Sequence, residues 1–185
     1  LESSEQDQGG DSRREEKSSF LRIWCSGYYS PRRFIEQLAR KPAPRWGFFA
    51  QLIRSALISL ALYLPTSLIG VEPPTPSYLG FIPTGRYYLA LIWITPLVIA
   101  AQWLLGGSVI HLILRLLGRS SSFDQILNIT GMSSLVIGTV LVIWDWLWFA
   151  IGTVDQITLG ISHLVIDPWG VALIVVGLKR ILGGP

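Results

Sequence analysis

The stretch SSFDQILNITGMSSLVIGTVLVIWDWLWFA, residues 121–150, decides the fold. After its first five residues it carries one ionisable side chain, Asp145, in a run of 25 residues. About 20 consecutive apolar residues are enough for an α-helix to cross the ~30 Å hydrocarbon core of a bilayer. Ser122 and Gln125 have the spacing of a capping box, which favours a helix start just before this run. We therefore predict a membrane-spanning helix over residues 126–150.

The composition of the whole chain favours the same environment. Half of the 185 residues are hydrophobic, 15% are charged and the mean hydropathy is +0.47, which is more apolar than a water-soluble domain of this size normally is. Two further apolar runs are long enough to span, at about residues 47–69 and 87–117. Arg54 lies near the cytoplasmic end of the first run, where its long side chain is expected to reach the headgroups. The predicted fold class is all-α: a polytopic transmembrane helical bundle, residues 46–185, with amphipathic interfacial helices at its N-terminus.

The last apolar stretch, residues 156–182, is harder to interpret. Gln156 to Ile166 supplies only 11 residues, and the part from Pro168 onward only 15, each fewer than a full crossing needs. Asp167 and Pro168 suit an N-cap and a first helical turn, so an interruption is expected there. The prediction is a fourth span that is broken or partly re-entrant.

The front of the chain is polar and basic. Residues 1–18 hold almost no apolar side chain and are expected to form a disordered tail. Residues 19–45 combine apolar side chains at helical spacing with arginines, which predicts amphipathic helices on the membrane surface. Nine of the fifteen Lys and Arg residues precede Trp46, which predicts a cytoplasmic N-terminus and anionic lipid headgroups, not nucleic acid, as its partner. The side chains expected at the two membrane surfaces are Trp24, Arg32, Arg33 and Arg40 on the inner one and Trp144, Trp146 and Trp148 on the outer one.

Ionisable side chains inside a membrane are costly, so each is a candidate functional group. Asp145 could bind a proton or a cation, or it could be a structural residue that contacts water near the outer surface. His163 and Asp167 are four residues apart and would share a helix face, as a metal pair or a proton relay requires. In the alternative, Asp167 caps a helix and His163 lies at the interface. We favour the structural interpretation of all three residues.

The other histidine, His111, lies one turn before Arg115, where hydrogen bonding by a neutral imidazole is the favoured interpretation. Axial ligation of a haem or chlorin by His111 or His163 is the alternative. No GxSxG, HExxH or CxxC motif occurs, and Cys25 is the single cysteine. We therefore expect no enzyme activity, no catalytic residue, no bound metal and no cofactor.

Three stretches of the chain carry a resemblance to a known family. They are YYSPRRFIEQLARKP at residues 28–42, SSFDQILNITGMSSLVIG at residues 121–138 and DPWGVALIVVGLKRI at residues 167–181. In this order they resemble the Yip domain family of membrane proteins, and more closely its prokaryotic branch. The chain departs from the family pattern at Gly131, which is followed by Met132 where the family commonly has tyrosine. The acidic cytoplasmic motif of eukaryotic members is absent too.

The resemblance implies a non-catalytic organiser that binds partner proteins, here in a bacterial cytoplasmic (inner) membrane. The family usually has five spans, whereas this chain reaches Pro185 just after the fourth, so a final helix is expected to be missing or cut away. Without it the outer faces of the last segments would be open to lipid or to another subunit. The resemblance thereby implies assembly with other membrane subunits or with further copies of the chain.

Three functions are compatible with these observations. The leading hypothesis is a non-enzymatic integral membrane scaffold that binds partners through small-residue helix faces such as the Gly106, Gly107, Ser108 cluster. A transport or channel component is the first alternative, motivated by Asp145 and by the proline-interrupted segment at Asp167. The second alternative is an accessory subunit of a respiratory or photosynthetic complex, suggested by eight Trp, two His and the incomplete set of helices.

Overall fold

The computed structural model describes residues 19–40, 44–73, 80–152 and 156–183. The disordered tail expected over residues 1–18 lies outside this part of the chain. The described residues are helical and contain no strand, which confirms the all-α prediction. The helices are α1 (Phe20–Tyr29), α2 (Pro31–Arg40), α3 (Pro44–Ala56), the π-helix η1 (Leu57–Tyr63), α4 (Leu64–Ile69), the short 3₁₀-helix η2 (Thr84–Arg86), α5 (Tyr87–Leu116), α6 (Phe123–Ile151) and α7 (Gln156–Ile181).

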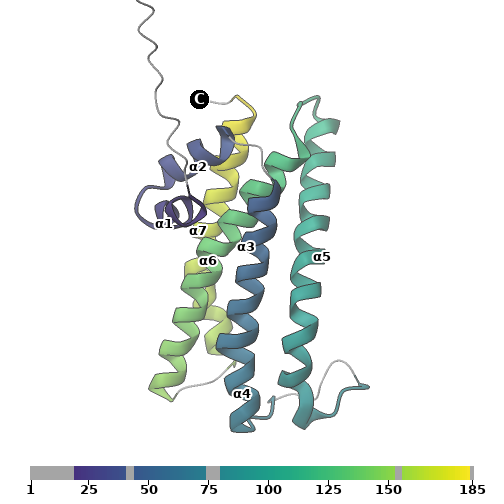
Figure 1. Ribbon diagram of the computed structural model, residues 1–185, viewed down its shortest axis with the longest axis vertical. Helices are drawn as coiled ribbons and strands as arrows, with labels where there is room; N and C mark the ends of the chain where they lie inside the picture. Colours follow the sequence, from purple (N-terminus) through teal and green to yellow (C-terminus); the bar gives the residue numbers. More distant parts are fainter. Residues whose placement is uncertain (1–18, 41–43, 74–79, 153–155, 184–185) are drawn as a thin grey trace, which may run out of the picture.

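Four helical stretches are long and apolar enough to cross a membrane, which confirms a polytopic transmembrane bundle. They are Arg45–Ile69, Thr84–Leu116, Phe123–Ile151 and Thr158–Ile181. Figure 1 shows that they stand side by side and alternate in direction along the chain, so that α1, α2 and the end of α7 lie at one end of the bundle. We call this the basic end, because Arg115, Lys179 and Arg180 also lie there.

The interruption expected at Asp167 is not present. The helix α7 runs without a break from Gln156 to Ile181, with Pro168 inside it and the Asp167 side chain exposed on its flank. A proline inside a helix removes one backbone donor, whereas a complete break would leave several N–H and C=O groups without partners in an apolar surrounding. The fourth span is therefore a single helix of 24 residues and is neither broken nor re-entrant.

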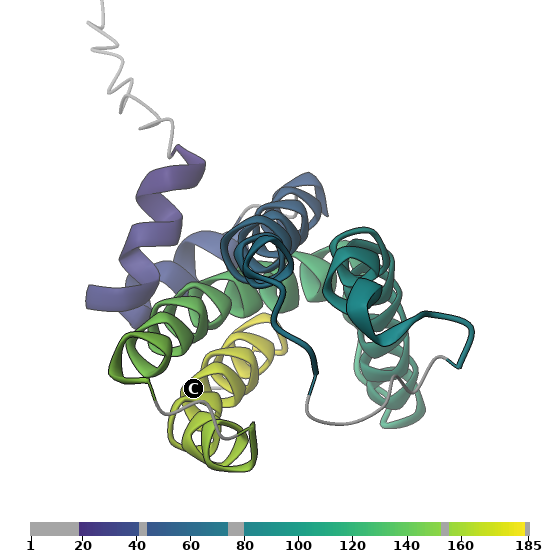
Figure 2. The same cartoon turned by 90° about the horizontal axis from the view of Figure 1, so that it is seen from below.

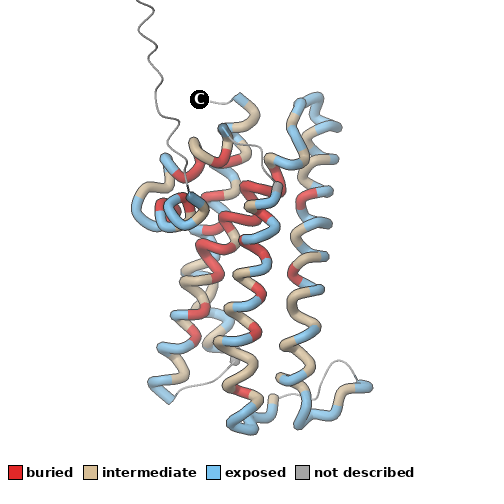
Figure 3. The backbone as a smooth tube through the Cα atoms, viewed as in Figure 1, coloured by how far each residue is buried: buried red, intermediate tan, exposed pale blue. Residues whose placement is uncertain are grey.

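The helix α6 forms the centre of the bundle. In its most apolar stretch 72% of the residues are buried, against 11–17% in the other three spans. Figure 2 shows α6 between α3 and α7, with α5 standing to one side, and Figure 3 shows that the buried residues gather along α6 and the faces turned toward it. The core consists of Ile23, Phe34, Ile35, Leu38, Ala50, Ile129, Met132, Leu135, Val136 and Leu173.

Small residues allow α3 and α6 to approach closely. These two helices run parallel, and Gln51 of α3 contacts Ser134 of α6 across 83 residues of sequence. A Cβ atom added to Gly131 would lie 2.6 Å from the Cα atom of Gly47, so no side chain fits between the two backbones at this point. Glycine at such a crossing is the common means of close helix packing in a membrane.

The N-terminal helices α1 and α2 pack on the basic end of α6 and α7. Their apolar side chains Ile23, Phe34 and Leu38 are fully buried against the bundle. The two helices are present where amphipathic segments were expected, but their main apolar residues contact protein. That their remaining faces lie on a membrane surface stays a prediction.

The predicted capping box before α6 does not form. The helix does begin after Ser122, but the Ser122 side chain makes no capping hydrogen bond. The Gln125 side chain instead donates from its amide nitrogen to the backbone carbonyl of Ala39, 3.3 Å away, at the end of α2. The capping pattern therefore predicted the helix start correctly, but Gln125 bonds a residue of another helix and does not cap its own.

At two prolines inside the spans, a side chain from a neighbouring helix donates to the backbone carbonyl that the proline cannot bond. In an α-helix the N–H of residue 65 would donate to the carbonyl of Ala61, but Pro65 has none. That carbonyl accepts a 2.8 Å hydrogen bond from the indole of Trp146. Pro96 likewise cannot donate to the carbonyl of Ile92, which accepts a 3.1 Å bond from the Ser59 hydroxyl. Membrane helices tolerate proline where neighbours bond the freed backbone groups in this way.

Candidate functional site

An acid and a histidine meet inside the bundle, opposite the basic end. Asp145 of α6 is 7% exposed, and its Oδ1 atom lies 2.7 Å from Nε2 of His163 on α7. The sequence placed His163 with Asp167 on one helix face, and it identified Asp145 separately. The structure pairs His163 with Asp145, and Asp167 lies one turn further along α7. Across the described residues, no group of three or more His, Cys, Asp or Glu side chains could hold a metal ion.

Three tryptophans lie next to Asp145 in the sequence, at positions 144, 146 and 148. The indole N–H of Trp144 donates to the Ser162 hydroxyl at 2.8 Å, and the ring of Trp148 stands edge-on to it at a centroid distance of 6.4 Å. The indole of Trp146 donates to the Ala61 carbonyl, as described above. The N–H groups of Trp144 and Trp146 thus bind protein acceptors. A membrane-surface role for the three rings stays a prediction.

A pocket of about 410 Å³ opens beside the acid–histidine pair. Its wall includes both members of the pair and reaches Tyr63 and Arg54 on the first span. Glycines 138 and 160 widen it, since neither contributes a side chain. A carboxyl group and an imidazole at 2.7 Å can share or exchange a proton. The rest of the pocket wall is mostly apolar, with Arg54 and Tyr63 as its other polar side chains.

Arg54 is a candidate functional residue that the sequence interpretation missed. Its long side chain was expected to reach the headgroups, yet it turns into the bundle. Its Nη1 atom donates to the Ser134 hydroxyl at 3.2 Å, and its Nε lies against Gly138 without a hydrogen-bond partner. Gln51 donates to the same hydroxyl at 2.9 Å, and Asp167 is the acidic group that interacts electrostatically with Arg54.

The position of Arg54 in the sequence gave one indication that its side chain lies inside the bundle. At 1.5 Å per residue it lies about 14 Å along the helix from Arg45, where the first span begins. A side chain so far from the helix end is more easily satisfied inside the bundle, where Gly138 leaves room for it. A charge in the interior of a membrane bundle usually marks a functional or a packing constraint.

The second histidine is separate from this cluster. His111 lies near the basic end of α5, whereas His163 lies in the opposite half of α7. The His111 ring stands edge-on to Phe123 at 5.6 Å, and its Nδ1 atom is buried without a hydrogen-bond partner. The structure therefore does not bring the two haem or chlorin candidates together.

The residues predicted for the inner membrane surface lie on α1 and α2 at the basic end. The Trp24 indole donates to the Tyr28 hydroxyl at 3.0 Å. Burial raises the pKa of Tyr28 above its ordinary value, although this hydrogen bond acts in the opposite direction. The side chain of Arg32 is 92% exposed and forms an ion pair with Glu36 at 3.3 Å. Arg33 and Arg40 are exposed as well, so all three guanidinium groups are accessible to a charged partner.

Comparisons with known proteins give one match. A family model described as the Yip1 domain matches residues 27–185, which is most of the chain and includes all four spans. Comparison with curated proteins finds no match, and neither does comparison with solved structures. The matched range begins within α1 and takes in Asp145, His163 and Arg54.

Proposed function

Because the chain belongs to the Yip1 domain family, we propose that it is a non-enzymatic integral membrane scaffold that binds partner proteins within the bilayer. The observation that carries this proposal is the unequal burial of the spans. Among the four described spans α6 is enclosed, while most residues of the other three are not buried. Such surfaces can be covered by lipid or by the helices of other proteins.

The face of α5 that borders a groove beside α3 and α6 supports the second possibility. Gln102 and Gly106 are exposed on it, and a Cβ atom added to Gly106 would meet nothing within 4 Å. Polar and small side chains are unfavourable or neutral toward lipid, but they favour close contact with another helix. We infer that this face binds a partner helix, either of another subunit or of a second copy of the chain.

We place the protein in a bacterial inner membrane with its N-terminus in the cytoplasm. The support is the distribution of charge. Arg32, Arg33, Arg115, Lys179 and Arg180 all lie at the basic end of the bundle, and loops rich in Lys and Arg remain on the cytoplasmic side. The opposite end carries only Glu72 and Arg86 among its described loop residues.

Site-specific photocross-linking in native membranes tests the partner proposal. A photoreactive amino acid at Leu105, which is 66% exposed beside Gly106, is expected to form discrete adducts with protein. Gly106→Leu should abolish those adducts by blocking close approach, and it should not disturb the fold because the space there is open. The same probe at the buried Ile129 is the control and should react only within the chain. Adducts with lipid alone at Leu105 would overturn the proposal.

A transport role is the second candidate, and the observation that favours it is the paired Asp145 and His163 beside their pocket. Transport proteins commonly place ionisable pairs inside the membrane. Proton or cation flux in proteoliposomes tests it, with Asp145→Asn as the variant. Flux that the parent protein supports and the variant lacks would establish this function, and absence of flux in the parent would exclude it.

A further inference from the structure

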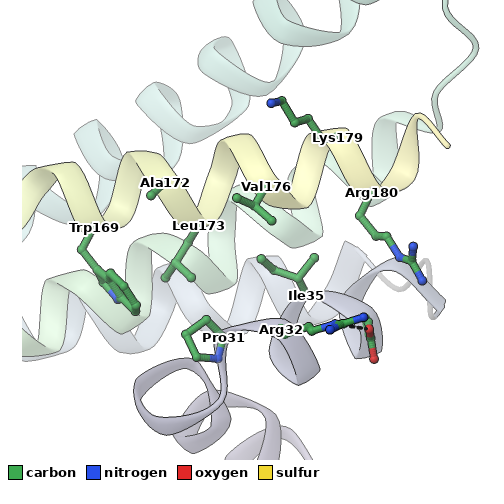
Figure 4. Close-up of a pocket in the computed structure, with 10 residues that line it drawn as sticks. Pro31, Arg32, Ile35, Trp169, Ala172, Leu173, Val176, Lys179 and Arg180 are labelled. Carbon is green, nitrogen blue, oxygen red and sulfur yellow. Dashed lines mark hydrogen bonds and ion pairs between the residues drawn. The ribbon is translucent and has the colours of Figure 1, made fainter. Parts of the chain in front are cut away.

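A groove of about 540 Å³ runs between α2 and α7 at the basic end. Figure 4 shows its floor, with Arg180 on the side of α7 that faces α2 and Lys179 projecting from the other side of that helix. The floor is apolar and consists of Ile35 from α2 with Trp169, Leu173 and Val176 from α7. The rim carries three cationic side chains, Arg32, Lys179 and Arg180.

The charges on the rim are unbalanced. Glu36 is the one carboxylate in the wall of the groove, and it is paired with Arg32 at 3.3 Å. Among the residues that the structure describes, Lys179 and Arg180 form no ion pair. Cations in the last turn of a helix also stabilise its dipole, but that role would not require an apolar groove beside them. The rim therefore offers two uncompensated positive charges next to an apolar floor.

The groove is charged at the level of the headgroups and apolar at the level of the acyl chains, as one leaflet of a bilayer is. Its cationic rim coincides with the end of the fourth span, Ile181, where the headgroups of a membrane lie. Its floor extends from there toward the bundle centre for about 10 Å along α7, from Val176 to Trp169. Val171 and Val175, which neighbour the floor residues in the sequence of α7, are exposed as well.

From this arrangement we propose that the groove binds one anionic phospholipid. An acyl chain lies on the apolar floor, and the phosphate contacts Lys179 and Arg180, which are the side-chain types that bind phosphate in proteins. A soluble peptide would not reach a floor at this depth in the bilayer. The binding closes the space between α2 and α7, so the lipid holds the N-terminal helices to the fourth span. This inference does not depend on the scaffold role proposed above.

Native mass spectrometry of the full chain in neutral detergent tests the site. We expect one phosphatidylglycerol to be retained in preference to phosphatidylcholine. Each lysine or arginine near a lipid phosphate contributes enough that the double change Lys179→Gln and Arg180→Gln should weaken phosphatidylglycerol binding about 30-fold. Ala172→Trp should also weaken it, by filling the floor while leaving the charge unchanged. All three positions are exposed, so the bundle should keep its fold.

The matched control is the double change Arg115→Gln and Arg119→Gln. It removes the same charge from exposed positions at the same end of the bundle, but outside the groove. Phosphatidylglycerol affinity should stay within about twofold of the parent. Equal weakening by this control would show diffuse surface attraction and overturn the site. Equal retention of phosphatidylcholine, or displacement by soluble glycerol phosphate at the same concentration as the lipid, would overturn it too.

Discussion

Asp145 is an acidic side chain in the interior of a membrane bundle. The hydrogen bond to the His163 imidazole offsets part of the free energy that burial of its carboxyl group costs. The pair joins α6 to α7 at 2.7 Å, with the His163 side chain 28% exposed and Asp145 nearly enclosed. Removing either partner leaves a polar group with little water to replace the lost bond. The two residues therefore act as a unit.

A double-mutant cycle tests that dependence. Asp145→Asn and His163→Ala should each lower the free energy of unfolding, and the double variant should cost less than the sum. The expected coupling energy is about 1–3 kcal/mol, as for residues in direct contact. Unfolding by SDS titration in mixed micelles measures it. Additive losses would mean that the 2.7 Å contact contributes nothing.

Glycine at the α3–α6 crossing gives a second test at the level of single residues. Gly131→Ala places a methyl group 2.6 Å from the Gly47 backbone, which cannot yield, so the helices must separate. Overpacking of this kind costs about 1–3 kcal/mol. Thermal unfolding in detergent should detect the loss.

The matched control for that change is Gly106→Ala on α5. The added Cβ atom meets nothing within 4 Å there, so stability should be unchanged or should rise by up to about 1 kcal/mol from improved helix propensity. If both variants lost the same stability, the close crossing would not be the cause.

Single residues are where sequence reasoning reached its limit. It identified Asp145, His163 and Asp167 as ionisable groups at membrane depth, but the i to i+4 rule relates residues only within one helix. It therefore could not see that His163 bonds Asp145, 18 residues away on another helix. For Arg54 it predicted a side chain that reaches the headgroups. The guanidinium instead donates to the hydroxyl of Ser134, 80 residues further along the chain.

At the scale of helices, Pro65 and Pro96 mark the places where neighbouring helices form hydrogen bonds to one another. Pro65 and Pro96 each leave a carbonyl that its own helix cannot bond in the α pattern, and each carbonyl accepts from a neighbouring helix. The first span is tied to α6 through Trp146, and α5 is tied to η1 through Ser59. The π-helix Leu57–Tyr63 ends two residues before Pro65 and contains Ser59, whose hydroxyl donates to the Ile92 carbonyl.

This attachment predicts that Trp146→Phe is destabilising only while Pro65 is present. Loss of the indole donor should cost about 0.6 kcal/mol and at most about 1.7 kcal/mol, the average and the maximum measured for hydrogen bonds between membrane helices. In a Pro65→Ala background, the alanine N–H can bond the Ala61 carbonyl, so the same change should cost much less. SDS unfolding of the four proteins measures both values. An equal cost in the two backgrounds would contradict the role assigned to the indole.

The helix α7 shows why caps are weaker evidence in a membrane than in water. An Asp–Pro pair is typical of a helix N-terminus, and the residues on either side were too few for separate spans. The pieces form one helix because both contact α6. Before Pro168, His163 bonds Asp145 and Ser162 accepts from Trp144, and after it Gly170 and Gly177 pack against α6. The continuous contact surface outweighs a single missing N–H.

At the scale of the whole molecule, hydropathy predicted the number of spans but not their arrangement. The most apolar stretches of α5 and α6 have the same mean hydropathy, 2.0, yet 17% of one and 72% of the other is buried. Lipid tails and protein interior are equally apolar, so hydropathy does not separate a central helix from a peripheral one. Small and polar side chains such as Gly131, Ser133 and Ser134 are the better signal for the central position of α6.

Orientation is testable through the single cysteine. Cys25 is exposed on α1, so a membrane-impermeant maleimide should leave it unlabelled in intact cells and label it after permeabilisation. In a Cys25→Ser background, a cysteine introduced by Gly85→Cys at the opposite end should be labelled in intact cells. Gly85 has open space for the new side chain. Labelling of Cys25 in intact cells would refute a cytoplasmic N-terminus.

The parallel pairing of α3 with α6 has a consequence during biosynthesis. Gln51 and Arg54 enter the bilayer with the first span, but the hydroxyl that accepts from both belongs to a residue 83 positions after Gln51. A ribosome that adds 5–20 residues per second needs about 4–17 s to make that interval. For those seconds an amide and a guanidinium must find water, lipid phosphate or an insertase as a substitute. This delay is the point at which assembly of the nascent chain is most vulnerable.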